Sequence, residues 1–193
     1  MRFRKAVVAT LLASWCVAVG VGVVIAFGYS TTAGAAGATP STWPSDSVIR
    51  PTSDGFTVVM FLHPSCSCSV ASLHELADAV GQGGAPHHVV LAFADTSGDP
   101  TGGVAWSAAD RVPGATRWID RGGVEATRFG AVTSGFTVVY DRRGALRFAG
   151  GVTAARGEVG DNIGRRQVAA ALAGDSNDVR RHAVFGCAIG DAR

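Results

Sequence analysis

Two cysteines one residue apart are the feature of this sequence with the most evident chemistry. Cys66 and Cys68 stand in FLHPSCSCSV, residues 61–70, directly after an apolar run and directly before a helix-like pattern. The pair has three interpretations: a redox pair, a set of metal ligands, or two thiols that only pack. A cysteine at a helix start has a lowered pKa, because backbone N–H groups there stabilise an anion. A thiolate is both a nucleophile and a soft metal ligand, so this placement leaves the first two interpretations open.

The spacing of the two cysteines favours redox chemistry. One intervening residue allows a disulfide between Cys66 and Cys68, but in a tighter ring than a two-residue spacer would give. Strain in such a ring raises the reduction potential, so the bond would oxidise partners readily or be easily reduced.

The N-terminal part of the chain indicates the compartment in which the thiols are located. Residues 6–29, AVVATLLASWCVAVGVGVVIAFGY, carry no charge and reach the roughly 20 apolar residues that cross a bilayer as a helix. Basic residues precede this span and none follows before Arg50. The positive-inside rule therefore places the N-terminus in the cytoplasm and the chain after Tyr29 outside.

We expect residues 1–29 to form a cytoplasmic basic end and a single transmembrane anchor. A cleaved signal peptide is the alternative, since AGAAGA at 33–38 offers cleavage sites, although residues 6–29 exceed the about 7–15 residues of a signal h-region. In both cases the rest of the chain is exported, where disulfides persist. The expected location is the inner (cytoplasmic) membrane, single-pass, with the C-terminal domain on the periplasmic side.

Export leaves an odd number of thiols outside the cytoplasm: Cys66, Cys68 and Cys187. At least one of them is therefore free, metal-bound or paired with another chain. Cys187, in HAVFGCAIG, is a candidate third redox partner or metal ligand, with packing of the C-terminal tail as the alternative. His63, beside the turn, could lower the thiolate pKa or bind a metal, and otherwise is a loop histidine hydrogen-bonded to the backbone.

Composition limits the remaining classes. The 193 residues, 47% hydrophobic, suit one compact domain with extensions. The net charge of +2 comes without a clustered basic face, so we expect no nucleic-acid partner. Residues 30–47 are mostly small, uncharged and proline-punctuated, which predicts a flexible linker. The domain is then expected over residues 48–193.

Strands and helices alternate along this domain. Continuous apolar, β-branched runs predict strands buried on both faces, and the last two predicted strands form a hairpin. The order predicts an α/β sheet with an antiparallel edge. Predicted strands cover 56–62, 87–94, 116–120, 136–141 and 145–151, and predicted helices cover about 70–80, 104–112, 124–130 and 165–174.

The helix after the cysteines has two candidate starts. Ser72 and Glu75 have the spacing of a capping box, and Ser69 is an equally good cap. GQGG, residues 81–84, ends the helix.

The arrangement resembles a thioredoxin-like fold, and more closely the RedB-type branch of exported thioredoxin-like proteins. The resemblance covers about 56–187 and lies in FLHPSCSCSVASL, in RFGAVTSGFTVVYDRRGALRFAGGVTAARGEVGDNIGR and in the late VFGC. It implies a three-layer α/β/α sandwich with a mixed sheet, preceded here by one N-terminal transmembrane helix.

Laid on this chain, the family pattern assigns roles to individual residues. Cys66 falls on the attacking cysteine, while Ser69 stands where the usual resolving cysteine would be. Cys68 lies one residue early and would itself resolve the mixed disulfide. Gly135 stands at the family's cis-proline and Met60 at the buried acid of some thioredoxins, so this chain departs from the pattern at both.

Two functions from different classes follow. The first is an anchored thiol-disulfide oxidoreductase in which Cys66 attacks a partner disulfide and Cys68 or Cys187 resolves it, exchanging electrons with exported or membrane proteins and needing no organic cofactor. The second is a Cu(I) or Zn site built from Cys66, Cys68, Cys187 and His63, or His182 in place of His63. A thioredoxin-like module that binds a partner without chemistry is a third possibility.

Overall fold

The computed structural model describes residues 2–95, 99–175 and 177–190, and the last residues of the expected domain lie outside the described part. The chain divides into two units, Met1–Thr32 and Ala33–Arg193. Each unit is described by itself.

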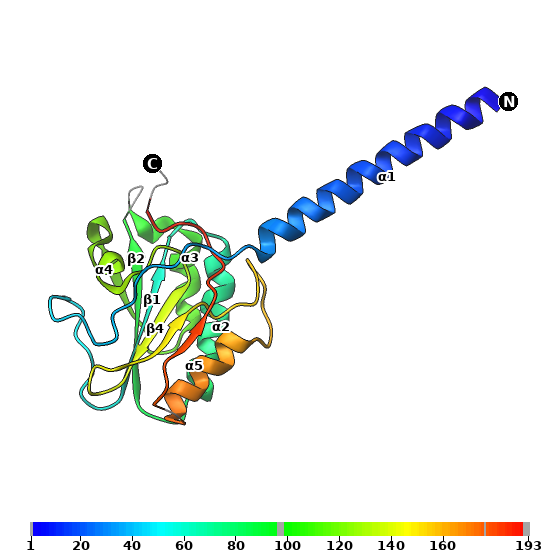
Figure 1. The fold of residues 1–193 in the computed structure, drawn as a ribbon. Helices are drawn as coiled ribbons and strands as arrows, with labels where there is room; N and C mark the ends of the chain where they lie inside the picture. Colours follow the sequence, from blue (N-terminus) through cyan, green and yellow to red (C-terminus); the bar gives the residue numbers. More distant parts are fainter. Residues whose placement is uncertain (1, 96–98, 176, 191–193) are drawn as a thin grey trace. The chain divides into compact units, whose positions relative to one another are not determined.

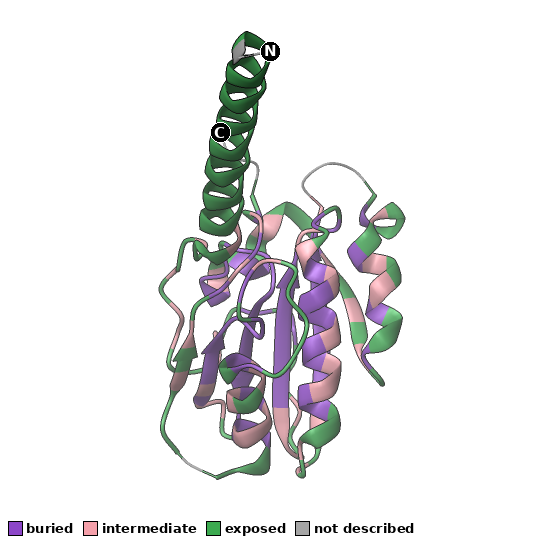
Figure 2. Cartoon of the chain, turned by 90° about the vertical axis from the view of Figure 1, so that its right-hand side faces the viewer, coloured by how far each residue is buried: buried purple, intermediate pink, exposed green. Residues whose placement is uncertain are grey.

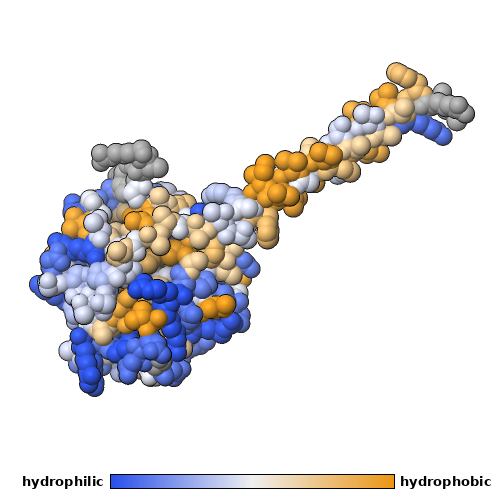
Figure 3. Space-filling view, viewed as in Figure 1, coloured by the Kyte–Doolittle hydropathy of each residue, from blue (hydrophilic) through white to orange (hydrophobic). Residues whose placement is uncertain are grey.

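The first unit is one long helix, α1 (Arg2–Thr31). Its span Phe3–Thr31 is long and apolar enough to cross a membrane, and its surface is apolar apart from its basic N-terminal end (Figure 3). An exposed apolar helix near an N-terminus fits either a signal sequence or a single membrane anchor.

The second unit is built on one six-stranded mixed sheet in the order β3-β2-β1-β4-β5-β6 (Figure 1). Strands β1, β2 and β3 run parallel, and β4 pairs antiparallel with both β1 and β5. The central strands consist of the predicted apolar runs and are buried (Figure 2). The strands are β1 (Phe56–Leu62), β2 (His87–Ala94), β3 (Thr116–Asp120), β4 (Phe136–Tyr140), β5 (Leu146–Gly150) and β6 (Arg180–His182).

Helices cover both faces of the sheet and make it a three-layer sandwich. Side chains of α2 (Cys68–Gln82), α3 (Val104–Ala108) and α5 (Ile163–Ala173) share one core cluster with one face of β1 and β2. Side chains of α4 (Val124–Phe129) join the other face. Alternate residues of β1 enter the two clusters, as the period of a strand requires. The predicted thioredoxin-like α/β/α architecture is confirmed.

The sheet continues past the predicted hairpin. β6 pairs parallel with β5, so the hairpin is not the edge of the sheet as expected. β6 has the sequence Arg-Arg-His, without an apolar run, and the hydrogen bonds of its main chain hold it. Polar side chains are suited to an edge strand, which leaves no hydrophobic period to read in the sequence.

The start of α2 also differs from the expected caps. The helix begins at Cys68 with Ser67 in the N-cap position, so neither Ser69 nor Ser72 caps it. Ser69 and Glu75 are instead buried inside the helix, where they bind groups from other elements.

The segment expected as a linker has ordered contacts with the domain from Gly34 onward. The Gly34 amide donates to the Val184 carbonyl at 2.8 Å, and the Tyr140 hydroxyl donates to the Pro40 carbonyl at 2.8 Å. A Cβ on Gly37 would lie 2.2 Å from the Gly130 carbonyl oxygen. Small residues therefore allow this segment to approach the domain closely, and it belongs to the compact unit Ala33–Arg193.

Trp43 is the main side-chain anchor of this segment. Its ring packs edge-on against Phe129 and Tyr140, with centroids 5.1 and 5.2 Å away, and its amide donates to the Gly144 carbonyl at 2.8 Å. Packing against two core aromatics ties the N-terminal segment to the face that carries α4.

We predict that Trp43→Ala lowers the free energy of unfolding by roughly 2 kcal/mol, somewhat less than the about 3–5 of a fully buried aromatic, because Trp43 is half-buried. Urea unfolding of the full chain in mild detergent, followed by circular dichroism, measures the change. Trp118→Ala on β3 is the matched control, since Trp118 is exposed, and should change stability by less than about 0.5 kcal/mol. Equal effects of the two substitutions would contradict an anchoring role for Trp43.

Candidate active site

The candidate site lies at the turn between β1 and α2. This turn is held against α3, because the Pro64 carbonyl accepts the Ala105 amide at 3.1 Å. The contact is close, since a Cβ on Gly103 would lie 2.4 Å from the same carbonyl oxygen. The turn places Cys66 in the interior, with only 3% of its surface exposed, and Cys68 partly exposed at the start of α2.

Cys187 is brought directly to Cys66. Their Sγ atoms lie 2.8 Å apart, although 121 positions separate the two residues in the chain. Both cysteines are free of disulfide bonds, and this separation is longer than the about 2.05 Å of a disulfide bond. The structure therefore brings together two of the three thiols that follow the apolar span and that the sequence singled out.

Hydrogen bonds to the Cys66 sulfur decide its ionisation. Burial raises the pKa of this thiol, but donors from Cys187 and Ser69, through both side chain and backbone, favour the thiolate and bring the pKa below its ordinary value. The Ser69 amide belongs to the first turn of α2, as expected for a cysteine before a helix. Two of these four donors belong to Cys187 in the C-terminal tail. The position of Cys66 before a helix did not predict them.

A chain of hydroxyl groups supports Ser69. The His63 amide donates to the Ser134 hydroxyl at 2.7 Å, and the Ser134 and Ser69 hydroxyls lie 2.7 Å apart. If Ser69 donates to Cys66, it must accept from Ser134, which sets the direction of every bond in the chain. Ser69 and Ser134 are both buried, so the chain is fixed by packing as well.

The C-terminal tail reaches the site by main-chain pairing. The Ser134 amide donates to the Cys187 carbonyl at 2.8 Å and the Ile189 amide to the Val132 carbonyl at 3.0 Å, forming an antiparallel bridge between Thr133 and Ala188. Val184 and Ile189, three residues before and two after Cys187, are buried in the core cluster on the α4 face, together with residues of the strands. These two side chains hold the tail on either side of its cysteine.

The other two thiols are held in their neutral form. Burial and the neighbouring Cys66 raise the pKa of Cys187 to about 12, and the same two causes raise the pKa of Cys68. Arg156 opposes both shifts through its positive charge, and it also donates a hydrogen bond to the Gly186 carbonyl. The site thus contains one thiol whose pKa is lowered, which favours the thiolate, and two thiols whose pKa values are raised, which favours the protonated form.

His63 lies at the turn with a backbone role. Its Nδ1 accepts the Ser65 amide at 3.2 Å, which is the loop-histidine alternative of the sequence analysis. Gly135 has a left-handed φ of +90°, and its amide donates to the Phe61 carbonyl at 2.8 Å. No cis peptide bond occurs in the described ranges, so the family's cis-proline geometry is absent here.

The expected metal ligands do not gather into one cluster. Within the described part of the chain, the group of three potential ligands whose donor atoms lie within 4.8 Å of one another is His74, Glu75 and Asp78. Arg165 forms ion pairs with Glu75 at 3.2 Å and with Asp78 at 3.0 Å, so a cation already occupies these carboxylates.

Glu75 is a buried anion that sequence reasoning interpreted as a cap. It has 0% exposure and accepts the Gly160 amide at 2.7 Å and the Asn162 side-chain amide at 3.1 Å, besides the ion pair with Arg165. The arrangement fastens the loop before α5 to the middle of α2. A glutamate next to Leu76, among the apolar residues of a helix, was the available signal for such a partner.

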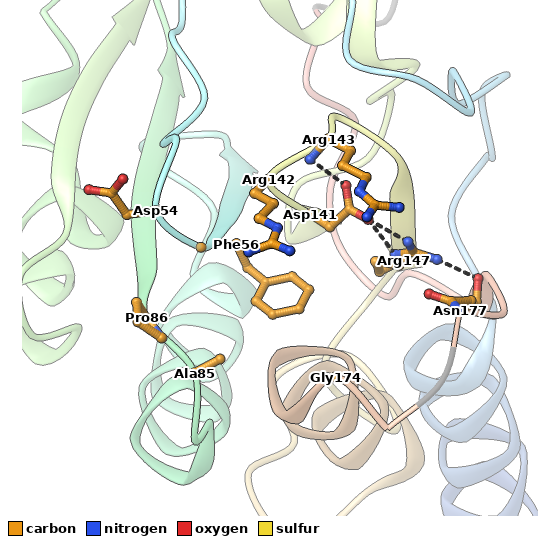
Figure 4. A pocket seen from close by; sticks show the side chains of 11 residues that line it. Asp54, Phe56, Ala85, Pro86, Asp141, Arg142, Arg143, Arg147, Gly174 and Asn177 are labelled. Carbon is orange, nitrogen blue, oxygen red and sulfur yellow. Dashed lines mark hydrogen bonds and ion pairs between the residues drawn. The ribbon is translucent and has the colours of Figure 1, made fainter.

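A hollow of about 480 Å³ lies at the other end of β1 (Figure 4). It is lined by Phe56 at the start of the strand and by the turn between β4 and β5, where Arg147 is bound to Asp141 and to the Asn177 carbonyl. β1 is seven residues long, about 20 Å at the rise of a strand, which separates this hollow from the thiols.

Comparisons with known proteins bear on the fold. Neither a scan against protein-family models nor a search of curated proteins finds a match. Among solved structures, a hypothetical protein from Sinorhizobium meliloti 1021 has a TM-score of 0.56 at 21% identity, over 85% of this chain and 99% of that chain. An uncharacterized conserved protein from Geobacillus kaustophilus has a TM-score of 0.55 at 19% identity, over 83% and 92%.

A further match is to a secreted disulfide oxidoreductase from Mycobacterium tuberculosis, with a TM-score of 0.44 at 16% identity, over 62% of this chain and 81% of that chain. At the identities of the two better matches, the similarity concerns the fold. The chain thus has an α/β fold that it shares with these two solved structures, and a thiol pair lies just after its central strand.

We predict that the side chain at position 187 sets the pKa of Cys66. In a chain that also carries Cys16→Ser and Cys68→Ser, Cys187→Ser keeps a hydroxyl donor, whereas Cys187→Ala leaves only the backbone donor. Losing a hydrogen bond that favours the thiolate should raise the pKa of Cys66 in the alanine variant relative to the serine variant. Ultraviolet absorbance of the thiolate against pH measures both values, and identical titrations would contradict the role of the tail.

Proposed function

We propose that the protein is a membrane-anchored, extracytoplasmic thiol-disulfide oxidoreductase of the RedB-type branch. The single observation that carries the proposal is the 2.8 Å approach of the Cys187 sulfur to a Cys66 sulfur whose pKa is lowered by its hydrogen bonds. A low-pKa thiolate beside a second thiol is the arrangement that disulfide exchange requires. The apolar helix α1 serves as the anchor, with the thiols in the periplasm.

The exchange proceeds in two steps. The Cys66 thiolate attacks a disulfide of an exported or membrane protein, forming a mixed disulfide, and one partner sulfur leaves as a thiolate. The Cys187 thiol loses its proton and attacks the Cys66 sulfur, which releases the second partner sulfur as a thiolate. Two electrons have passed to the partner disulfide, which becomes a dithiol, while this chain holds a Cys66–Cys187 disulfide. The reverse steps oxidise a partner dithiol.

Cys187 is the better resolving thiol of the two candidates. Its sulfur already lies 2.8 Å from the Cys66 sulfur, whereas the positive charge of Arg156 favours the ionisation of both candidates. Attack by Cys68 would close a strained ring with one intervening residue. We therefore assign attack to Cys66, resolution to Cys187 and an auxiliary role to Cys68.

The alternative of a Cu(I) or Zn site has less support from the geometry. Soft thiolates suit these ions, but Cys66, Cys68, Cys187 and His63 do not bring three donor atoms within 4.8 Å of one another among the described residues. A protein isolated with stoichiometric metal that protects all three exported thiols would reverse this preference.

We predict that Cys66→Ser reduces the turnover of a disulfide substrate to the rate of buffer, because the attacking sulfur is gone. Cys187→Ser should keep the first step and accumulate a mixed disulfide on Cys66, visible as added mass. Cys16→Ser is the matched control, since Cys16 lies in α1, and should keep full turnover. Full activity of Cys66→Ser would remove the proposed nucleophile.

We also predict the pairing in the oxidised protein. After mild oxidation, proteolysis and mass spectrometry should recover residues 66 and 187 in one linked peptide, and two thiols should disappear per chain. Reduction should restore both thiols. A Cys66–Cys68 link as the main product would instead assign resolution to Cys68.

A further inference from the structure

We propose that the C-terminal tail, residues 185–189, occupies the surface on which a partner docks, and that this surface accepts an extended segment with glycine immediately before its cysteine. The inference rests on the proposed function for the role of that cysteine. The partner is a stretch of another exported polypeptide that carries Gly-Cys, a further residue, and then an apolar residue.

The tail covers the sulfur that a partner must reach. Cys66 is only 3% exposed, and its sulfur lies between Ser69 of α2 and the Cys187 sulfur of the tail, which is 2.8 Å away. A partner sulfur that approaches Cys66 must take the place of the Cys187 sulfur. The tail therefore has to leave this position before an external disulfide can react.

The surface beneath the tail binds main chain. Two hydrogen bonds between the tail and residues 132–134 join backbone groups, Ser134 N–H to the Cys187 carbonyl and Ile189 N–H to the Val132 carbonyl. Such pairing does not depend on the side chains of the added strand, so another extended segment can form the same bonds. Arg156 supplies a side-chain donor to the carbonyl of Gly186.

The residue before the cysteine is restricted by contact with the surface. A Cβ on Gly186 would lie 2.0 Å from the Ser134 carbonyl oxygen and 3.4 Å from the Thr133 methyl carbon. A backbone carbonyl in a paired segment cannot move aside as a flexible side chain can. A partner strand in the same register therefore needs glycine at this position.

Two residues after the cysteine, the surface accepts an apolar side chain. Ile189 is buried in the core cluster, whereas Ala188 beside it is exposed, as the alternation of a strand requires. On the other side, Val184 is also buried, and a Cβ on Gly151 would lie 2.9 Å from its Cα. The chain up to Val184 is thus closely packed, and the exchangeable part begins after it.

The first test measures access to Cys66 in the full-length, reduced protein. Gly186→Ala should loosen the tail and raise the rate of Cys66 alkylation by iodoacetamide by about tenfold, which corresponds to roughly 1.4 kcal/mol. Rates are compared at about pH 10, above the ordinary thiol pKa of about 8.5, so that changes in ionisation matter less. Ile189→Ser is a second variant with the same expected direction. An unchanged rate in both variants overturns the proposal.

Gly190→Ala is the matched control, because a Cβ on Gly190 meets nothing within 4 Å and the residue is exposed. Its alkylation rate should equal that of the unchanged protein. If Gly190→Ala accelerates alkylation as much as Gly186→Ala, the effect does not come from the contact with Ser134, and the proposal fails.

The second test adds a redox-inactive copy of the tail to Gly186→Ala. The peptide Val-Phe-Gly-Ser-Ala-Ile-Gly, at about the millimolar effective concentration of a short tether, should protect Cys66 from alkylation. The peptide Val-Phe-Ala-Ser-Ala-Ile-Gly should not. Equal protection by the two peptides, or none by either, overturns the glycine requirement. Because neither peptide has a sulfur, this result is separate from the disulfide-exchange assay, whose failure alone would remove the redox role.

Discussion

The stabilisation of a thiolate at the buried Cys66, just after the central strand, is the constraint on which the rest of the site depends. Removing a charge from water is costly unless hydrogen-bond donors replace the water. At Cys66 those donors come from Ser69 on α2 and from Cys187 on the tail. A thiolate at this position therefore needs two parts of the chain, far apart in sequence, to be in place together.

The sheet provides the framework that brings these parts together. β1 delivers Cys66, and β4, paired antiparallel beside it, is preceded by the segment that carries Ser134. Ser134 then serves both sides of the site, because its hydroxyl lies against Ser69 and its amide holds the Cys187 carbonyl. The serine in TSG, which has no conspicuous motif, thereby links the helix to the tail.

Most of the fold could be predicted from the sequence because its strands are buried on both faces. Runs such as 56–62 and 87–94 have a composition that only a central strand explains, and their bounds match the structure. The edge strand β6, which was not predicted, lacks such a pattern, and so do the contacts of residues 33–47. Residues 33–47 and β6 are held by main-chain bonds and by single anchors such as Trp43, which leave no period in the sequence.

The candidate site was predictable in its members but not in its pairing. An odd number of exported thiols drew attention to Cys187, yet spacing alone favoured Cys68 as the neighbour of Cys66. The proximity of residues 66 and 187 depends on an isolated antiparallel bridge between Thr133 and Ala188, near the C-terminal end of the sequence. Long-range pairing of this kind is set by tertiary structure, so local sequence rules could not supply it.

The buried Glu75 extends the same dependence through α2. Its carboxylate is matched by Gly160, Asn162 and Arg165, so the helix that begins at Cys68 is fastened to the loop before α5. Arg156 precedes that loop and donates to Gly186 of the tail. Removing one partner from a buried ion pair typically costs about 3–5 kcal/mol. The attachment of the loop to α2 is therefore at least as strong as the few hydrogen bonds that hold the tail, each of which contributes about 1 kcal/mol. Contacts thus run from α2 through Glu75 to the loop before α5, and from Arg156 to the tail that carries Cys187. The position of Cys187 beside Cys66 therefore depends on residues that do not contact either cysteine.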